Sequence, residues 1–247
     1  MAKLTVVGIG PGDADNMTLR AHRALQASRA IVGYHVYVDL VRPRYPDKEF
    51  YTTPMTRESE RCRMALELAE RGKETALVCS GDSGVYGLAA LVYELRGERS
   101  APEIAVVPGL TAACSGAAVL GAPLTHDFAV ISLSDRLTPW PAIEARLEAA
   151  AAGDLSIVLY NPASHGRPEH LRRACGILLR SLPPERPCGV ARSIGRDGES
   201  GMVLTLEELA DYPADMFCTI FIGNSTTRVI GGRLVTPRGD RPGEAVP

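Results

Sequence analysis

Short apolar segments alternate with longer amphipathic segments along most of this chain, and no other feature constrains its fold as strongly. The short segments are rich in aliphatic residues and end at glycine, proline or polar residues, which is typical of buried strands. We expect strands at residues 4–9, 30–32, 75–79, 104–107, 129–133, 156–160, 189–191, 202–205 and 217–222.

The segments between these strands carry apolar residues three and four positions apart, as at Cys62, Ala65 and Ala69, and this spacing predicts amphipathic helices. Thr205 and Glu208 have the spacing of a capping box at the start of the last helix. The alternation as a whole predicts an α/β protein with mixed, mainly parallel sheets. We expect helices at residues 18–28, 57–71, 85–95, 111–119, 140–152, 168–182 and 206–212.

Glycine, proline and polar residues without periodicity gather in "LGAPLTHD", residues 120–127, which we interpret as a link between two α/β domains. The expected N-terminal domain is residues 1–120 and the expected C-terminal domain is residues 121–237. Residues 238–247 have too little apolar content to pack, so we expect a mobile tail there. A chain of 247 residues is long enough for this organisation.

The charge and composition exclude several classes of protein. A formal net charge of −2 offers no basic surface for nucleic acid. Only three of the 27 basic residues are lysines, which fits either the base composition of a genome or a carboxylate-rich ligand that arginine binds bidentately. No apolar run is long enough for a membrane span, no signal peptide is evident, and the six cysteines form no metal motif. We therefore expect a cytoplasmic protein without membrane or metal contacts.

The first strand leads into "GIGPGD", residues 8–13, which has the look of a dinucleotide-binding loop. Three observations argue against that function. Gly12 comes one residue too early for G-x-G-x-x-G, Pro11 lacks an N–H donor, and the next helix begins late, near Thr18. A nicotinamide or flavin cofactor is therefore not expected, and no loop carries the lysine of a nucleoside triphosphate site.

Further polar loops follow later strands. Because ligands of open α/β sheets bind beyond the carboxyl ends of strands, the shared position of these loops predicts a binding cleft at that edge. Their many glycines and few charges suggest backbone hydrogen bonds to a ligand with a polar ring and a sugar. The loops are "SGDSGVYG" (80–87), "PGLTAA" (108–113), "SLSD" (132–135), "YNPAS" (160–164) and "FIGNSTT" (221–227).

In their order along nearly the whole chain, "GIGPGD", "SGDSGVYG", "PGLTAA", "SLSD" and "YNPAS" resemble the motifs of the tetrapyrrole methylase family. The resemblance implies two α/β domains with a cleft between them, S-adenosylmethionine (SAM) as methyl donor, a tetrapyrrole as acceptor, and a homodimer. "GYHVYVDL", "YNPAS" and "ARSIGRDGE" look most like the members that methylate C17 of a corrin precursor in cobalamin biosynthesis, with ring contraction. The metal-free substrate, precorrin-3B, is favoured over its cobalt-containing counterpart.

The resemblance also assigns residues by position. Ser80 departs from the first glycine of the Gly-Gly-Asp of the family, and Asn161 stands where relatives often have methionine. The SAM contacts that the resemblance implies are Pro11, Ser80, Gly81, Asp82, Val85, Thr111, Ala112, Asn161, Ala191, Arg192 and Thr219.

Methyl transfer from a sulfonium needs mainly positioning, but ring contraction asks for a group that moves a proton. Asp82 and Asp135 are the catalytic candidates, although Asp82 could instead cap its own turn and Asp135 could pair with Arg136. His126 and Tyr86 are further polar residues expected at the cleft edge. Substrate contacts are expected from His35, Tyr86, Ser134, Asp135 and Arg136. The arginines that could pair with the acetate and propionate arms are Arg42, Arg44, Arg136, Arg167 and Arg192, of which we expect two or three to matter.

Three alternatives stay open on the sequence alone. The chain could methylate C11 or C20 of another precorrin, or it could belong to the branches that act on an elongation-factor histidine or on ribosomal RNA. The RNA branch should show a basic stripe, which a net charge of −2 does not favour. A protein that binds SAM or a tetrapyrrole without catalysis is the alternative of a different class.

Overall fold

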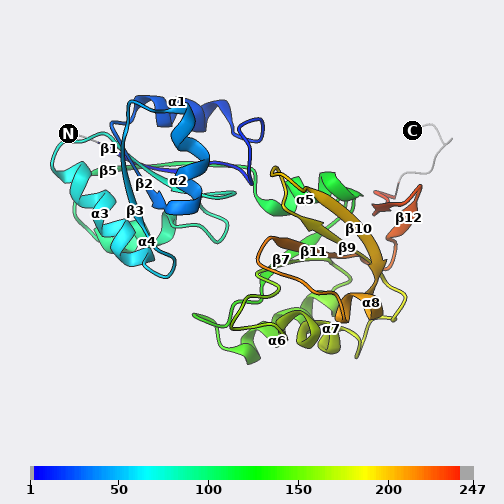
Figure 1. Cartoon of the computed structure of the whole chain (residues 1–247). Helices are drawn as coiled ribbons and strands as arrows, with labels where there is room; N and C mark the ends of the chain where they lie inside the picture. The colour runs from blue at the N-terminus through cyan, green and yellow to red at the C-terminus, as the bar shows by residue number, and fades with distance from the viewer. Residues whose placement is uncertain (1–2, 240–247) are drawn as a thin grey trace, which may run out of the picture. The chain divides into compact units, whose positions relative to one another are not determined.

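The protein divides into two compact units, Met1–Ala112 and Ala113–Pro247, in a computed structural model that describes residues 3–239 (Figure 1). Each unit combines a five-stranded sheet with helices, which confirms the expected α/β class. The division falls at the first residue of helix α5, whereas the sequence suggested a division after Leu120. Residues 240–247 of the expected tail lie outside the described residues.

The first unit contains a parallel sheet in the order β3-β2-β4-β1-β5. Its central strand β4 is buried over its whole length, which explains why its sequence is a continuous apolar run. Because all five strands are parallel, their carboxyl ends meet at one edge. The strands are β1 (Lys3–Gly8), β2 (Ala30–Tyr34), β3 (Glu49–Thr53), β4 (Thr75–Cys79) and β5 (Glu103–Val107).

Helices cover both faces of this sheet (Figure 1). On one face, Leu25 of α1 and Val38 of α2 belong to the same apolar cluster as Ile31 of β2. On the other face, Leu66 of α3 and Val92 of α4 pack in a second cluster. The helices are α1 (Leu19–Ala27), α2 (His35–Val41), α3 (Glu58–Glu70) and α4 (Ala89–Arg96), with the 3-10 turn η1 (Arg42–Arg44) after α2.

The second unit contains a mixed sheet in the order β10-β9-β11-β8-β7. Only β7 and β8 pair in parallel, and the other three strand pairs are antiparallel. The carboxyl ends of β7, β8 and β9 therefore share one edge with the amino ends of β11 and β10. The strands are β7 (Phe128–Ser132), β8 (Ser156–Tyr160), β9 (Pro187–Arg192), β10 (Ser200–Thr205) and β11 (Cys218–Ile222).

Helices α6, α7 and α8 pack on one face of the second sheet, and α5 packs on the other (Figure 1). Gly189 of β9 and Gly201 of β10 leave room for Leu120 of α5, whose methyl groups a Cβ at either position would approach closely. The predicted capping box is confirmed, since Thr205 and Glu208 cap α8 reciprocally. The helices are α5 (Ala112–Leu120), α6 (Trp140–Ala152), α7 (His170–Leu178) and α8 (Leu206–Ala210).

Several elements were not expected from the sequence. The edge strand β3 and the short helix α2 are half-exposed, so neither has a clear apolar pattern. The expected link at 120–127 contains a strand, because β6 (Gly121–Ala122) pairs with β13 (Arg233–Val235), which in turn pairs with β12 (Arg228–Ile230). Within residues 3–239, no helix has both the length and the apolar character that a membrane crossing needs.

Candidate functional site

The loops after β1, β4 and β5 meet at the carboxyl edge of the first sheet and are joined backbone to backbone. The Gly10 amide donates to the Gly81 carbonyl at 3.0 Å, and the Gly81 amide donates back to the Gly10 carbonyl at 2.7 Å. Gly10 and Gly81 have φ angles of +79° and +66°, which side chains disfavour. These loops were predicted separately from "GIGPGD" and "SGDSGVYG", and the structure brings them together.

The third loop approaches this pair even more closely. A Cβ on Gly109 would lie 2.1 Å from the Gly81 carbonyl oxygen, and a Cβ on Gly8 would lie 2.6 Å from the Gly109 amide nitrogen. Real side chains cannot occupy such space, so glycine is required here by contact as well as by conformation. We call Gly8, Gly10, Gly81 and Gly109 the glycine junction.

The side chain of Asp82 links the loop after β4 to the loop after β5 through hydrogen bonds to backbone amides. Its Oδ1 accepts hydrogen bonds from the Gly84 and Val85 amides at 2.7 and 2.9 Å, and its Oδ2 accepts one from the Gly109 amide at 2.8 Å. Partial burial raises the pKa of Asp82, but these amide donors outweigh it and hold the pKa below its usual range. The geometry supports the turn-capping interpretation of Asp82, and its catalytic assignment stays a prediction.

The loop after β4 also explains why α4 begins at Ala89 and not at residue 85. Asp82 draws residues 84 and 85 into a turn, and Tyr86 takes a left-handed φ of +54°. Val85 and Tyr86 are 40% and 57% exposed as a result, so the loop presents apolar surface beside the glycine junction. Pro11 is buried, and Ser80, Thr111 and Ala112 are half-buried around the same edge.

Two further residues lie at the ends of β2 and β3. His35 begins α2, is exposed, and stacks edge-on against Tyr34 with 4.4 Å between ring centroids. Arg61 of α3 was missed by the sequence analysis. It is only 4% exposed, and it donates to Thr53 Oγ1 at 2.8 Å and to the Pro54 carbonyl at 2.9 Å. An arginine next to Cys62 on the apolar face of a predicted helix was the signal that could have revealed it.

In the second unit, the "SLSD" and "YNPAS" loops follow the parallel neighbours β7 and β8 and bind each other. Asn161 donates from Nδ2 to Ser132 Oγ at 2.9 Å, and the Ser134 amide donates to the same hydroxyl at 3.2 Å. Asn161 has a left-handed φ of +54°, which asparagine tolerates better than most residues. The two motifs are therefore one structural unit.

Asp135 lies between two basic side chains, Arg167 of the loop after β8 and His170 at the start of α7. Its Oδ1 is 3.4 Å from Arg167 Nη1, and its Oδ2 is 3.2 Å from His170 Nε2. The His170 N–H is not aligned with the carboxylate oxygen, so this contact is not a well-formed hydrogen bond. Desolvation raises the pKa of Asp135, but His170 and Arg167 offset it and leave the pKa lowered. His170 was not singled out from the sequence, because its position gave no motif.

The remaining expected SAM contacts lie on neighbouring strands of the second sheet. Ala191 of β9 and Thr219 of β11 are direct cross-strand partners, and both are buried. Arg192 is exposed, and its Nη2 and Nε lie 2.6 and 3.2 Å from Asp215 Oδ2. Its guanidinium is thus committed to an internal carboxylate.

Two expectations about the shared edge were wrong. "FIGNSTT" follows β11, which runs antiparallel to β8, so it lies at the opposite edge of the sheet from "SLSD" and "YNPAS". There Ser225 binds Asp154, which lies two residues before β8 begins. His126 precedes β7 and lies at that same opposite edge, where it contacts Asp127. Strand direction, which the sequence did not reveal, decides both cases.

The other arginines expected to bind carboxylates differ in their partners. Arg42 lies 3.7 Å from Asp39 and stacks over the Phe50 ring at 4.4 Å. Arg136 is exposed and has no ion-pair partner among residues 3–239. Leu137 beside it is 98% exposed. Across the described part of the chain, no cluster of three or more histidine, cysteine or acidic side chains is placed to hold a metal ion.

Comparison with known proteins gives a consistent result. The family of tetrapyrrole (corrin/porphyrin) methylases matches residues 3–210. A Salmonella typhimurium protein named probable cobalt-factor III C(17)-methyltransferase is 47% identical over 237 residues, covering 96% of this chain and 98% of the relative. A Priestia megaterium cobalt-factor III methyltransferase is 41% identical over 242 residues, and the match covers 96% of this chain but 45% of that longer protein.

Solved structures share the fold. The crystal structure of the methyltransferase CobJ aligns with a TM-score of 0.90 at 37% identity, covering 96% of this chain and all of that one. A uroporphyrin-III C-methyltransferase from Thermus thermophilus, solved with S-adenosylhomocysteine, aligns with a TM-score of 0.72 at 21% identity, covering 90% of this chain and 97% of that one. At that level of identity the second likeness concerns the fold alone.

Proposed function

Because the chain belongs to the tetrapyrrole (corrin/porphyrin) methylase family, we propose that it transfers a methyl group from SAM to C17 of a corrin precursor in cobalamin biosynthesis. One observation carries the choice of reaction. The Salmonella typhimurium relative named for this C17 methylation is 47% identical over nearly the full length of both chains. The proposed substrate is cobalt-factor III, which that name specifies, in place of the precorrin-3B favoured by the sequence motifs.

The glycine junction and the neighbouring Val85 and Thr111 are the proposed SAM-binding surface of the first unit. Two facts support this assignment. The loops that follow β1, β4 and β5 offer backbone groups and exposed apolar surface, and residues 8–18, 80–88 and 108–112 contain no lysine or arginine, which suits a ligand without phosphates. A tightly joined backbone also fixes the position of a donor, which is what methyl transfer from a sulfonium mainly requires.

The second unit supplies the proposed contacts to the tetrapyrrole from the loop that holds Ser134, Asp135 and Arg136, with Asn161, Ala191 and Thr219 toward SAM. Methyl transfer forms a carbon–carbon bond as the sulfonium C–S bond breaks, and the electron pair stays on sulfur. The site therefore needs to align the acceptor carbon with the methyl group and to exclude water. Ring contraction and a homodimeric state are part of the same proposal.

A direct assay tests this function. The purified chain is incubated with SAM and either cobalt-factor III or precorrin-3B, and the tetrapyrrole is examined by mass spectrometry. We expect one added methyl group on the cobalt-containing substrate and one S-adenosylhomocysteine released per methyl transferred. Methylation of precorrin-3B alone would reverse the substrate choice, and no methylation of either would refute the function. Titration with SAM and with NAD separates donor binding from turnover, since only SAM is expected to bind.

A further inference from the structure

Arg167 is held in a fixed orientation by two neutral hydroxyl groups. Its Nη1 donates to Ser134 Oγ at 2.9 Å and its Nε donates to Ser164 Oγ at 3.2 Å. The backbone supports this geometry, since the Arg167 amide donates to the Ser164 carbonyl at 2.9 Å and the Ser164 amide donates back at 3.3 Å. Hydroxyl acceptors orient the guanidinium without neutralising its charge.

The carboxylate next to Arg167 neutralises it only in part. Charged N–H···O contacts are typically about 2.7–2.9 Å long, whereas Asp135 Oδ1 lies 3.4 Å from Arg167 Nη1. The second oxygen of Asp135 faces His170 at 3.2 Å. The Asp135 carboxylate is therefore shared between Arg167 and His170. If Arg167 bound another anion, Asp135 would keep its contact with His170.

Arg192 at the same edge shows the contrast. Two of its nitrogens lie within 3.2 Å of one Asp215 oxygen, so a ligand would have to displace a close ion pair. A ligand at Arg167 would have to displace only the long ion pair with Asp135. The side chain of Arg167 is 25% exposed, which leaves part of it accessible from solvent.

The groups around this cluster are mostly basic or aromatic. Arg136 is exposed beside Asp135, and His170 packs edge-on against Trp140 with 5.0 Å between ring centroids. Arg173 lies over the same indole ring at 4.1 Å. An incoming anion would therefore find the Arg167 guanidinium beside the Asp135 carboxylate, and the exposed Arg136 next to Asp135 in the chain.

We propose that Arg167 binds a carboxylate arm of the tetrapyrrole, and that Asp135 holds the guanidinium in place until the arm arrives and then stays with His170. The proposal rests on the proposed function, because it takes a polycarboxylate tetrapyrrole as substrate. Arg167 becomes the specificity-determining cation of the second unit, and Asp135 becomes its internal competitor.

The test compares KM and kcat for the methyl acceptor across a small set of variants, using whichever of the two tetrapyrroles the wild-type chain methylates. Arg167→Gln is expected to raise KM for the tetrapyrrole by about tenfold or more, because a charged hydrogen-bonding partner is lost. Arg167→Lys keeps the charge but loses the bidentate hydrogen-bonding geometry of the guanidinium. Its KM should therefore lie between those of wild type and Arg167→Gln. The dissociation constant of SAM should stay within about twofold in both.

A more specific experiment removes the carboxylate of Asp135, which competes with the substrate for Arg167. Asp135→Asn is expected to lower KM for the tetrapyrrole by about threefold, because the guanidinium no longer has a rival anion. In the double variant Arg167→Gln/Asp135→Asn this gain should vanish, which is the coupling expected of two residues that act on each other. Arg180→Gln is the matched control, since Arg180 follows α7 and pairs with Glu144 and Glu148 of α6 and with no residue of this cluster within residues 3–239.

Each outcome decides the question. A KM for Arg167→Gln within twofold of wild type, or a higher KM for Asp135→Asn, overturns the proposal while leaving the proposed function intact. Wild-type protein that binds SAM but methylates neither tetrapyrrole refutes the proposed function and this proposal with it. If Arg167→Gln does not fold by circular dichroism, Arg167→Lys and Asp135→Asn still decide the matter through KM.

Discussion

The two units differ in the kind of contact that joins the loops at the carboxyl ends of their strands. In the first unit the loops after β1, β4 and β5 are joined through main-chain atoms, and glycine is required where they touch. In the second unit the loops after β7 and β8 are joined through the side chains of Ser132, Asn161 and Arg167. A backbone surface can fix a ligand by shape, whereas a side-chain surface can select it by charge.

This difference has a consequence for substitution. At Gly8, Gly10 and Gly109 an added Cβ would collide with backbone, and at Gly81 the left-handed φ disfavours a side chain. The expected effects of substitution there are therefore large and independent of the chemistry of the new side chain. At the second edge a substitution removes one contact and leaves the others, so the expected effects are moderate and depend on charge. Four predictions test the contrast between the two edges.

The largest effect is expected for Gly109→Ala. The added Cβ would lie 2.1 Å from the Gly81 carbonyl oxygen and 2.7 Å from Gly8, and neither backbone segment can move without breaking the Gly10–Gly81 pair. We expect a loss of about 3 kcal/mol or more in unfolding free energy, measured by urea denaturation, together with loss of SAM binding. Gly176→Ala is the control, since nothing lies within 4 Å of its added Cβ. A Gly109→Ala protein as stable as wild type would remove the steric argument.

Asp82→Ala is expected to come next. It leaves the amides of Gly84, Val85 and Gly109 without their acceptor, and the loop after β4 loses its fastening to the loop after β5. We expect a loss of about 2 kcal/mol in unfolding free energy and weaker SAM binding by calorimetry. Asp82→Asn keeps one acceptor oxygen and should recover part of both. If Asp82→Asn instead keeps full SAM affinity but abolishes turnover, the carboxylate acts in catalysis and not in capping.

The structure also shows which parts of this contrast the sequence could predict. The glycine loops were recognisable because apolar strands punctuated by glycine have a local signature, and "SGDSGVYG" even suggested the capping role of Asp82. The partners of Asp135 were not recognisable. His170 lies 35 positions away in sequence, and its closeness to Asp135 depends on the parallel pairing of β7 with β8. Local pattern predicts elements, but contacts between loops follow from sheet order.

Strand direction was the other missing information. An apolar run predicts a strand but not which way it runs, so "FIGNSTT" was placed at the wrong edge. Arg61 was missed for a related reason, because its partners Thr53 and Pro54 lie at the end of an edge strand that the sequence did not predict. Elements that lack periodicity because they lie at an edge are the ones that position this arginine.

A smaller effect is expected at Asn161, where backbone and side-chain contributions can be separated. Its φ of +54° is disfavoured for alanine, and its Nδ2 binds Ser132 Oγ. We expect Asn161→Ala to lose about 1–2 kcal/mol in unfolding free energy, and Asn161→Gly to lose only the smaller share due to the hydrogen bond. Equal losses in the two variants would show that the side-chain contact, and not the backbone conformation, dominates at this loop.

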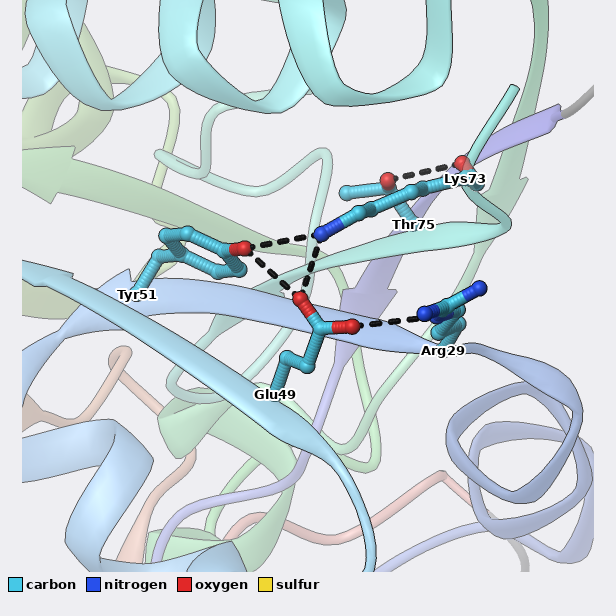
Figure 2. A network of polar contacts seen from close by, with 5 residues as sticks. All are labelled: Arg29, Glu49, Tyr51, Lys73 and Thr75. Carbon is cyan, nitrogen blue, oxygen red and sulfur yellow. Dashed lines mark hydrogen bonds and ion pairs between the residues drawn. The ribbon is translucent and has the colours of Figure 1, made fainter. Parts of the chain in front are cut away.

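The smallest effect concerns a charge network at the amino edge of the first sheet, remote from the glycine junction (Figure 2). Glu49 of β3 binds Lys73, accepts from Tyr51 at 2.8 Å and pairs with Arg29 at 3.0 Å. The hydrogen bond from Lys73, followed by those from Tyr51 and Arg29, lowers the pKa of Glu49 to about 2. This edge of the same unit is therefore held by side chains, as the loop edge of the second unit is.

Because the pKa of Glu49 is lowered in the folded state, the direction in which stability changes with pH is fixed. The network contributes stability above the unfolded pKa of 4.5, and that contribution is lost as the pH falls through about 2. Glu49→Gln, which mimics the protonated acid, should therefore lower Tm slightly at pH 7, and the gap to wild type should close as the pH falls below 4.5 toward 2. Glu67→Gln is the control, because Glu67 meets Arg71 only at 3.7 Å on an exposed helix face. A gap that stays constant with pH would mean that the carboxylate charge does not hold β3 in place, and that the contrast between backbone and side-chain edges does not extend to this end of the sheet.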